Sequence, residues 1–340
     1  MTEGSGRARP TIYDVARLAG VSTATVSRAL NGTGQIAPAT LATIEAAVEE
    51  LGYHPNTVAR SLVTKSTHTI ALLLPDITNP FYAALVRGIQ EAAFGHGRTM
   101  LLCTTEGDAE REEHYLRLLQ AKQVDGALVD GLVLPADRIA GFVEDGFPIV
   151  CLDRDIDSRS IPVVQVDNRI GGRLATKHLI ELGHTRIAHV TGAGELGISD
   201  ERLAGYRDAL TAARIEPDFD LVEEGRFTEE GGHDAASTLI EGHPDITAIF
   251  AANDLSALGV LNALAENGRS VPDDVSVVGF DDLRLAAYTS PPLTTVRQPG
   301  VEIARLATEI LIGLTEGRPA QRMRHLLEPE LVLRASTRAT

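Results

Sequence analysis

The sequence predicts an α/β protein in which a small all-α module precedes two lobes built on doubly wound parallel sheets. Residues 11–52 show only helical periodicity, whereas strand-like and helix-like segments alternate from residue 68 onward. The alternation runs in two series, and the second begins near residue 162. A chain of 340 residues has the length of two or three domains, and its 44% hydrophobic content is ordinary for a globular protein.

Three short helices are expected in the first module. Thr11 is the expected N-cap of the first, with Asp14 completing a capping box, and a glycine turn follows at Gly20. Ser22 is placed to cap a second helix that ends before a turn at residues 31–34. Pro38 suits the first turn of a third helix, which stops at Gly52.

The remaining chain reads as repeated strand–helix units of about 25–30 residues, the pattern of parallel doubly wound sheets. The expected strands are 69–74, 99–103, 126–129, 149–152, 163–166, 186–191, a short one near 221, 248–251, 275–279 and 326–333. The expected helices are 80–94, 110–121, 136–144, 170–182, 201–213, 229–241, 255–266 and 301–314. Ligands of such folds bind beyond the carboxyl ends of the strands, and between lobes where there are two.

Residues 12–30 have the spacing of a helix–turn–helix, a motif whose second helix enters the major groove of DNA. On that helix, Val26 and Leu30 share one side, and small polar residues with Arg28 lie opposite. Arg28 can donate two bonds to a guanine edge, while Thr25 and Ser27 can reach phosphates. An ordinary three-helix bundle with a solvated face remains the alternative.

A short linker follows, with a helix expected over residues 56–62 and Asn56 as its N-cap. Seven residues are too few for a stable isolated helix, because helices below about 12 residues are marginal in water. Apolar Ala59 and Leu62 beside Arg60 suit a segment that orders on DNA and wedges into the minor groove. A plain interdomain connector is the alternative.

Four segments carry a family resemblance: TIYDVARLAGVSTATVSRALN at residues 11–31, LGYHPNTVARSL at 51–62, VVGFDD at 277–282 and PLTTVRQP at 292–299. Together they closely resemble the lactose-repressor (LacI/GalR) family of bacterial transcription regulators, from about residue 10 to the end. The resemblance implies base-reading positions at Thr23, Ala24 and Arg28, and a hinge-helix wedge at Leu62. The candidate DNA-binding residues are Thr11, Thr23, Ala24, Thr25, Ser27, Arg28, Asn31, Asn56, Ala59, Arg60 and Leu62.

The resemblance also implies a periplasmic-binding-protein-like body that closes on a small effector. The expected division is a helix–turn–helix head at 1–55, a hinge helix and linker at 56–67, lobe 1 at 68–166 with 299–327, and lobe 2 at 167–298 with 328–340. Aspartates, an amide and guanidinium groups at strand ends suit a sugar, because every hydroxyl both donates and accepts. The candidate effector-binding residues are Asp76, Phe81, Asp153, Arg154, Arg202, Phe227, Asn253, Asp254 and Asp281.

The family pattern favours a sugar or sugar derivative over a purine, because Pro80 stands where a purine-binding member would carry an aromatic side chain. A homodimer is expected, because the leucine-heptad tail of lactose-repressor-type tetramers is missing after the last expected strand. The expected partners are therefore double-stranded operator DNA, a small-molecule effector and a second copy of the chain, with no membrane.

Composition and missing motifs limit the other function classes. The net charge is −16, but residues 1–67 hold six Lys/Arg against five Asp/Glu, so the first module can approach phosphate. The chain has no tryptophan, no membrane-length apolar run, no secretory signal and only two cysteines, which favours the cytoplasm. No catalytic, metal or cofactor motif is complete. A sugar-transport component and an α/β enzyme remain the competing hypotheses.

Overall fold

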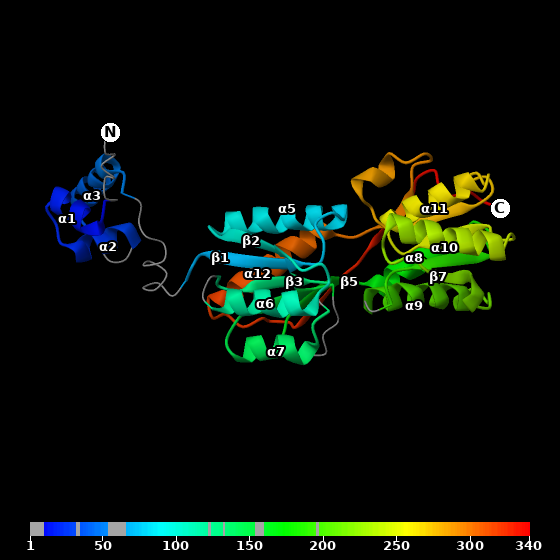
Figure 1. Cartoon of the computed structure of the whole chain (residues 1–340), viewed down its shortest axis with the longest axis horizontal. Coiled ribbons are helices and arrows are strands. Elements are labelled where there is room, and N and C mark those ends of the chain that lie inside the picture. The colour runs from blue at the N-terminus through cyan, green and yellow to red at the C-terminus, as the bar shows by residue number, and fades with distance from the viewer. Residues whose placement is uncertain are drawn as a thin grey trace, which may run out of the picture. The chain divides into compact units, whose positions relative to one another are not determined.

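The structure is a computed structural model that describes residues 10–31, 35–53, 66–121, 124–131, 133–153, 160–194 and 197–340. The chain divides into two compact units, residues 1–67 and residues 68–340. Figure 1 shows the helical first unit and the larger α/β unit, which are described separately below.

The first unit packs α1 (Ile12–Ala19), α2 (Thr23–Asn31) and α3 (Pro38–Leu51) around a small core centred on Val15, Val26 and Ile44. The expected caps are confirmed. The Asp14 carboxylate accepts hydrogen bonds from the Thr11 backbone N–H at 2.9 Å and from its hydroxyl at 2.7 Å. The Ser22 hydroxyl oxygen accepts from the Thr25 N–H at 3.1 Å, and Pro38 occupies the first turn of α3.

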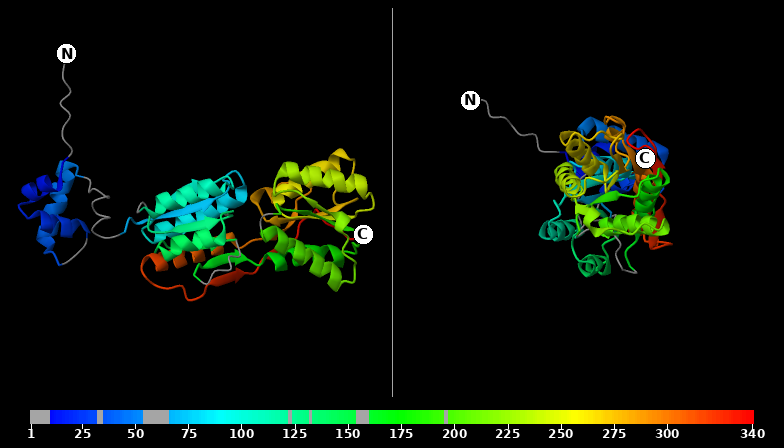
Figure 2. Two further views of the ribbon diagram at one scale, coloured as in Figure 1. Left: turned by 60° about the horizontal axis from the view of Figure 1, so that its bottom comes forward. Right: turned by 90° about the vertical axis from the view of Figure 1, so that its right-hand side faces the viewer.

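The second unit contains two six-stranded sheets, as the strand–helix alternation predicts (Figures 1 and 2). Lobe 1 is built on the sheet with strand order β11-β5-β4-β3-β1-β2, and lobe 2 on the sheet with order β12-β10-β9-β8-β6-β7. All neighbouring strands are parallel except β10 and β12. The strands are β1 (Thr69–Leu74), β2 (Thr99–Thr104), β3 (Ala127–Asp130), β4 (Ile149–Leu152), β5 (Val163–Val166), β6 (Ile187–Thr191), β7 (Val222–Glu224), β8 (Ala248–Ala251), β9 (Ser276–Asp281), β10 (Thr294–Arg297), β11 (Arg324–Leu327) and β12 (Glu330–Val332).

Helices cover both faces of each sheet, and each face has its own hydrophobic core. In lobe 1, α6 and α7 bury one face, and α5 with α12 bury the other. In lobe 2, α8 and α9 cover one face, and α10 and α11 the other. These helices are α5 (Pro80–Gly95), α6 (Ala109–Gln120), α7 (Ala136–Glu144), α8 (Asn168–Glu181), α9 (Gly197–Ala212), α10 (Glu229–Gly242), α11 (Asp254–Glu266) and α12 (Gly300–Thr315).

The chain passes between the two sheets three times: after β5, after β10 and between β11 and β12. Two details differ from the sequence expectation. Strand β10 (Thr294–Arg297) lies in a segment where no strand was expected, because its polar Thr294, Thr295 and Arg297 hide the hydrophobic pattern. The single strand expected over residues 326–333 is two strands, because Glu328 and Pro329 leave one sheet and the chain re-enters at the other.

Two glycines allow α8 and α9 to lie against each other. A Cβ added at Gly172 would lie 2.2 Å from the carbonyl oxygen of Arg202, and one added at Gly205 would lie 2.1 Å from the carbonyl oxygen of Arg169. Because these neighbours are backbone atoms, the helices would have to separate to admit even a methyl group. The contact fixes the start of α9, which carries Arg202.

Gly172→Ala should therefore lower the free energy of unfolding of the second unit by about 1–3 kcal/mol, since a methyl group is forced against backbone. Thermal and urea unfolding of the full chain measure this effect. Gly141→Ala is the matched control: it also lies in a helix, but nothing is within 4 Å of its added Cβ. That control should leave stability equal or raise it slightly, and equal losses in both variants would contradict the packing argument.

Candidate functional site

A cavity of about 600 Å³ lies at the carboxyl ends of strands from both sheets of the second unit. Lobe 1 contributes residues that follow β1, β3 and β4, and lobe 2 contributes residues that follow β6, β7, β8, β9 and β10. This volume is in the range of small-molecule sites in proteins. Its lining includes Asp76, Phe81, Tyr82, Asp130, Asp153, Arg202, Arg226, Phe227, Asn253, Asp281 and Gln298.

Arg202 is the central cation of this cavity. It sits in α9 with 1% of its surface exposed, and its Nε donates to Oδ1 of Asn168 at 2.8 Å. Its Nη1 donates to the carbonyl oxygen of Ala252 at 2.6 Å, and its guanidinium lies 3.7 Å from the centre of the Phe280 ring. Burial lowers the pKa of Arg202, while the carboxylates of Asp281 and Asp153 oppose that shift.

Asp281 ends β9 and lies 4.0 Å from Nη1 of Arg202. Its Oδ1 also accepts a hydrogen bond of 2.7 Å from Nε2 of Gln298. Burial raises the pKa of Asp281 to about 6, although the nearby Arg202 cation and the Gln298 hydrogen bond act in the opposite direction. The carboxylate therefore depends on its two partners to stay ionised near neutral pH.

Asp153 follows β4 of the other sheet and lines the same cavity. Burial raises its pKa, and the Arg202 cation is the strongest influence that lowers it. A single guanidinium thus faces one carboxyl group from each lobe. Since Asn168 follows the first passage between the lobes, its bond to Arg202 places this charge cluster beside the connecting segment.

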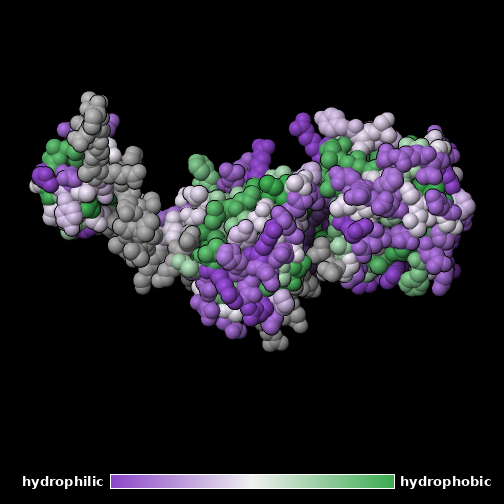
Figure 3. All heavy atoms as spheres, in the orientation of Figure 1, coloured by the Kyte–Doolittle hydropathy of each residue, from purple (hydrophilic) through white to green (hydrophobic). Residues whose placement is uncertain are grey.

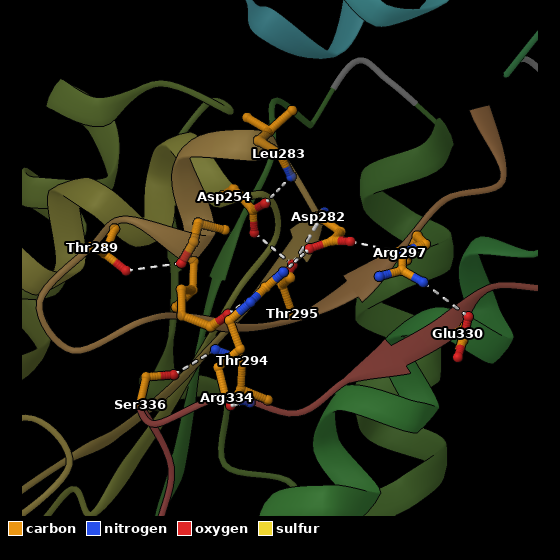
Figure 4. A network of polar contacts seen from close by, with 12 residues as sticks. Asp254, Asp282, Leu283, Thr289, Thr294, Thr295, Arg297, Glu330, Arg334 and Ser336 are labelled. Carbon is orange, nitrogen blue, oxygen red and sulfur yellow. Dashed lines mark hydrogen bonds and ion pairs between the residues drawn. The ribbon is translucent and has the colours of Figure 1, made fainter. Parts of the chain in front are cut away.

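Asp254 does not line the cavity, although the sequence placed it there. Its carboxylate accepts from the Leu283 N–H at 2.7 Å and from the Thr295 hydroxyl at 2.6 Å, so it is committed to the protein (Figure 4). These bonds hold the turn at the end of β9, where Asp281, the last residue of the strand, and Asp282 have positive φ angles of 111° and 57°. Asp254 therefore supports Asp281 instead of meeting a ligand.

A second group of ion pairs continues from that loop (Figure 4). Asp282 accepts from Nε of Arg297 at 2.7 Å and from Nη2 of Arg334 at 2.5 Å, and Arg297 also pairs with Glu330 at 3.3 Å. These side chains join β9, β10 and the segment around β12. These ion pairs therefore anchor to lobe 2 the ends of the two connecting segments that follow β10 and precede β12.

The remaining predicted residues form the walls. Asp76 accepts from the Thr78 N–H and hydroxyl at 2.7 and 2.6 Å, and so shapes the turn after β1. The Phe227 ring lies over Gly192, where an added Cβ would fall 1.9 Å from the ring. Asn253 caps α11 and donates to the Phe227 carbonyl oxygen at 3.0 Å. Phe81, at the start of α5, packs edge-on against Tyr82 with ring centres 5.4 Å apart.

In the first unit, α2 buries Val26 and exposes Ala24 and Arg28, as its periodicity predicts. Nε of Arg28 donates to the Ala24 carbonyl oxygen at 3.4 Å, so the two residues lie one turn apart on the same side. Thr25 is engaged at the N-terminus of α2 with Ser22. The exposed side of α2 therefore carries one arginine among small side chains.

Comparison with known proteins accounts for both units. Residues 11–56 match the profile of bacterial regulatory proteins of the lacI family, and residues 176–337 match that of a periplasmic binding protein-like domain. The HTH-type transcriptional regulator CelR of Thermobifida fusca is 40% identical over 340 residues, covering 97% of this chain and 99% of that protein. The chain belongs to the LacI family.

Other LacI-family relatives agree over nearly the whole chain. The HTH-type transcriptional repressor PurR of Aliivibrio salmonicida is 38% identical over 327 residues, covering 96% of this chain and 98% of that protein. A structure of the CelR–cellobiose complex is 38% identical, with a TM-score of 0.75, and covers 96% of this chain and all of its own. The lac repressor dimer bound to operator and the anti-inducer ONPF is 30% identical, with a TM-score of 0.88 over 98% of this chain and all of its own.

Family resemblance and strand-end position did not find every residue of the cavity. Tyr82, Asp130, Arg226 and Gln298 line it without having been expected. Asp130 ends β3, so the strand-end rule applied to every strand would have found it. Gln298 follows β10, which was itself missed, so no strand end marked it.

Several predicted LacI-family positions lie outside the described residues. These are Arg154 of the cavity and the hinge positions Asn56, Ala59, Arg60 and Leu62. Asn31 ends α2, but its side chain is likewise outside the description. Within the part of the chain that the structure covers, no group of three or more His, Cys, Asp or Glu side chains is placed to hold a metal ion.

Arg202→Met should lower the free energy of unfolding by about 3–5 kcal/mol at pH 7.5, since it leaves buried carboxylates without their cation. The loss should shrink at pH 5. Asp281 has a folded pKa of about 6, above the unfolded value of about 3.9, and this pKa rises further without Arg202. Such a carboxyl costs stability as the pH rises through its folded pKa, and the cost disappears when it is protonated.

Urea unfolding at both pH values measures this effect. Arg173→Met, on the exposed side of α8, is the control and should change stability by less than about 0.5 kcal/mol. A loss for Arg202→Met that is equal at pH 5 and pH 7.5 would argue against the charge interaction.

Proposed function

We propose that this LacI-family protein is a DNA-binding transcriptional repressor that binds a palindromic operator as a homodimer and is controlled by a sugar or sugar derivative. The observation that carries the proposal is the combination, in one chain, of a lacI-family head with a cavity lined by two lobes. A sugar-transport component has no use for a lacI-family head. The relatives named above are transcriptional regulators, which favours a regulator over an enzyme.

The head supplies sequence recognition. In a helix–turn–helix, the first turns of the second helix meet base edges, and here those turns expose Ala24 and Arg28. Arg28 is assigned to a guanine edge, with Thr23 and Ala24 beside it, and Thr11, Thr25, Ser27 and Asn31 positioned around the same helix. The hinge residues Asn56, Ala59, Arg60 and Leu62 are assigned to the minor groove at the operator centre.

Pairing of two chains is supported by exposed apolar side chains on lobe 1. Figure 3 shows hydrophobic residues gathered on the face of lobe 1 over α5 and β2. Phe94 of α5 and Val301 of the adjacent α12 are 82% and 80% exposed, which is costly for large apolar side chains in a lone subunit. The operator-bound relative is itself a dimer.

The cavity supplies control. Its walls come from two sheets connected by three segments, so a ligand that contacts both walls favours one arrangement of the lobes over another. The assigned residues are Asp76, Phe81, Asp153, Arg154, Arg202, Phe227, Asn253 and Asp281. We place the lobe boundaries near residues 166, 298 and 328, and the three passages of the chain between the sheets support this placement. A differential affinity of a few kcal/mol is enough to switch operator binding.

A sugar fits the chemistry of the walls. The cavity is lined by carboxylate and amide groups and by the Arg202 guanidinium. The Phe81 and Phe227 rings supply apolar surfaces for the faces of a pyranose. CelR, which shares 38% identity in its solved complex, is bound to cellobiose there. None of the helices that the structure describes is long and apolar enough to cross a membrane. Since the target is chromosomal DNA, we assign the protein to the cytoplasm.

The direct test is a gel-shift titration of the intact protein on palindromic DNA from upstream of its own gene. Specific binding should exceed binding to scrambled DNA by at least about 10³-fold and weaken steeply with salt. A thermal-shift screen with pentoses, hexoses, disaccharides, sugar phosphates and nucleosides then identifies the effector. Binding that is equal on operator and scrambled DNA at every salt concentration would refute the proposal.

Arg28→Ala should relax discrimination at one base pair of each half-site by about 1–3 kcal/mol, because a bidentate contact to guanine is lost. Gel shifts with operators varied at each position measure the change. Arg17→Ala, which removes the same charge from the exposed side of α1, should leave base preference intact. If the base preferences of Arg28→Ala equalled those of the unmodified protein, Arg28 would not read a base.

Asp281→Ala should abolish the response of operator binding to the effector found in the screen, while operator binding without effector is retained. The reason is that Asp281 lines the cavity and pairs with Arg202, whereas the head is a separate unit. Gel shifts with and without effector provide the measurement. Asp234→Ala, on the exposed side of α10, should respond normally. A normal response in Asp281→Ala would remove this residue from the effector site.

A further inference from the structure

Two buried oxygen atoms of the cavity have no hydrogen-bond partner among the described residues: Oδ1 of Asp153 and Oε1 of Gln298. The Gln298 side chain belongs to a residue that is 7% exposed, and its orientation is determined by its neighbour. Because the Asp281 carboxylate only accepts, the amide nitrogen of Gln298 must face it, and the amide oxygen is left over. Both unsatisfied atoms are acceptors, so the missing partner is a hydrogen-bond donor.

Asp130 lies on the same wall. Its Cα is paired with that of Leu152 in the neighbouring strand, so Asp130 and Asp153 end adjacent strands within one residue of each other. Asp130 is 3% exposed and lines the cavity. Burial and the nearby Asp153 carboxyl group both raise the pKa of Asp130, while a backbone hydrogen bond from Gly131 acts in the opposite direction.

Among the described residues that line the cavity, acidic side chains outnumber basic ones. Its described lining holds five acidic side chains against two arginines, and Arg202 already serves Asn168, the Ala252 carbonyl and Asp281. The five are Asp76, Asp130, Asp153, Glu229 and Asp281. Cavities lined by an excess of one charge attract ligands of the opposite sign and repel like charges.

We propose that Asp130 and Asp153 form a carboxylate pair that selects the effector: it binds adjacent hydrogen-bond donors of an uncharged or amino sugar, and excludes phosphorylated and acidic sugars. This inference rests on the proposed function and narrows its ligand class. Donors that reach the pair are either vicinal hydroxyls or an ammonium group. A phosphate or carboxylate placed there would add a negative charge beside two buried carboxyl groups.

The charge of a carboxylate strengthens the hydrogen bonds that a ligand donates to it. A hydroxyl or ammonium that donates to a buried carboxylate makes a stronger bond than one between neutral groups. A ligand hydroxyl or ammonium that donates to the pair also reduces the electrostatic repulsion between Asp130 and Asp153. This reduction in repulsion contributes to the affinity of the ligand. An anionic ligand increases the electrostatic repulsion at this pair.

The test uses thermal shift and calorimetry on the intact full-length chain, with Asp130→Asn as the isosteric variant. The probes are glucose, cellobiose, glucosamine, glucose 6-phosphate and glucuronate, so that charge is varied on a related ring. Asp145→Asn, an exposed lobe 1 aspartate outside the cavity, is the control. No DNA is present, so a failure of operator binding does not affect the result.

For the unmodified protein we expect binding of uncharged or amino probes and at least about tenfold weaker binding of the anionic ones. A preference for glucosamine over glucose would identify an ammonium as the donor, and the reverse would identify hydroxyls. Asp130→Asn should weaken the preferred probe about tenfold or more, and should reduce the discrimination against anions. Asp145→Asn should leave both quantities unchanged. Preferred binding of the anionic probes, or unchanged ratios in Asp130→Asn, would overturn the proposal.

The melting temperature of the ligand-free protein provides an independent test of the carboxylate pair. Since Asp130→Asn removes one of two neighbouring buried carboxylates, it should raise the Tm of the ligand-free protein at pH 7.5 by about 2 °C or more, and Asp145→Asn should not. A lower Tm for Asp130→Asn would show that the protein already satisfies the carboxylate, and the selective role would be wrong.

Discussion

The buried guanidinium of Arg202 is the interaction on which the rest of the second unit depends. It joins the segment that leaves β5, through Asn168, to the end of β8, through the Ala252 carbonyl, and it faces Asp281 at the end of β9. Its position requires that α8 and α9 lie in close contact, which in turn requires glycine at positions 172 and 205. One charge therefore couples helix packing, strand ends and the cavity.

Among the residues that the structure describes, the cavity has more acidic than basic side chains. Asp153 and Asp281, from different sheets, both face the same cation, while Asp130 stands beside Asp153. Burial raises the pKa of all three carboxyl groups. Under the proposed function, a ligand that donates hydrogen bonds to carboxyl groups of both lobes would favour one arrangement of the lobes over another.

Much of this could be read from the sequence, because hydrophobic periodicity and turn residues respond to local physics. The caps at Thr11 and Ser22 and the strand–helix alternation lie where predicted, and most of the described residues expected to bind an effector line the cavity. The failures have a common origin in tertiary structure. Strand β10 alternates too weakly to be recognised, so Gln298 had no strand end to mark it. Asp254 has the sequence position of a ligand contact, but the loop after β9 folds back and uses its carboxylate.

The three passages of the chain between the sheets have a consequence for biosynthesis. Lobe 1 receives β11 and α12 only from residues 300–327, after nearly all of lobe 2 has been made. Until then, the apolar face that α12 covers, formed by β1, β3, β4 and β5 beside α5, is open to water while the nascent polypeptide leaves the ribosome. Lobe 2 lacks only its edge strand β12 and the C-terminal residues 333–340 at that stage. The lobe that begins first is thus completed late, and it is the one that needs protection from aggregation during translation.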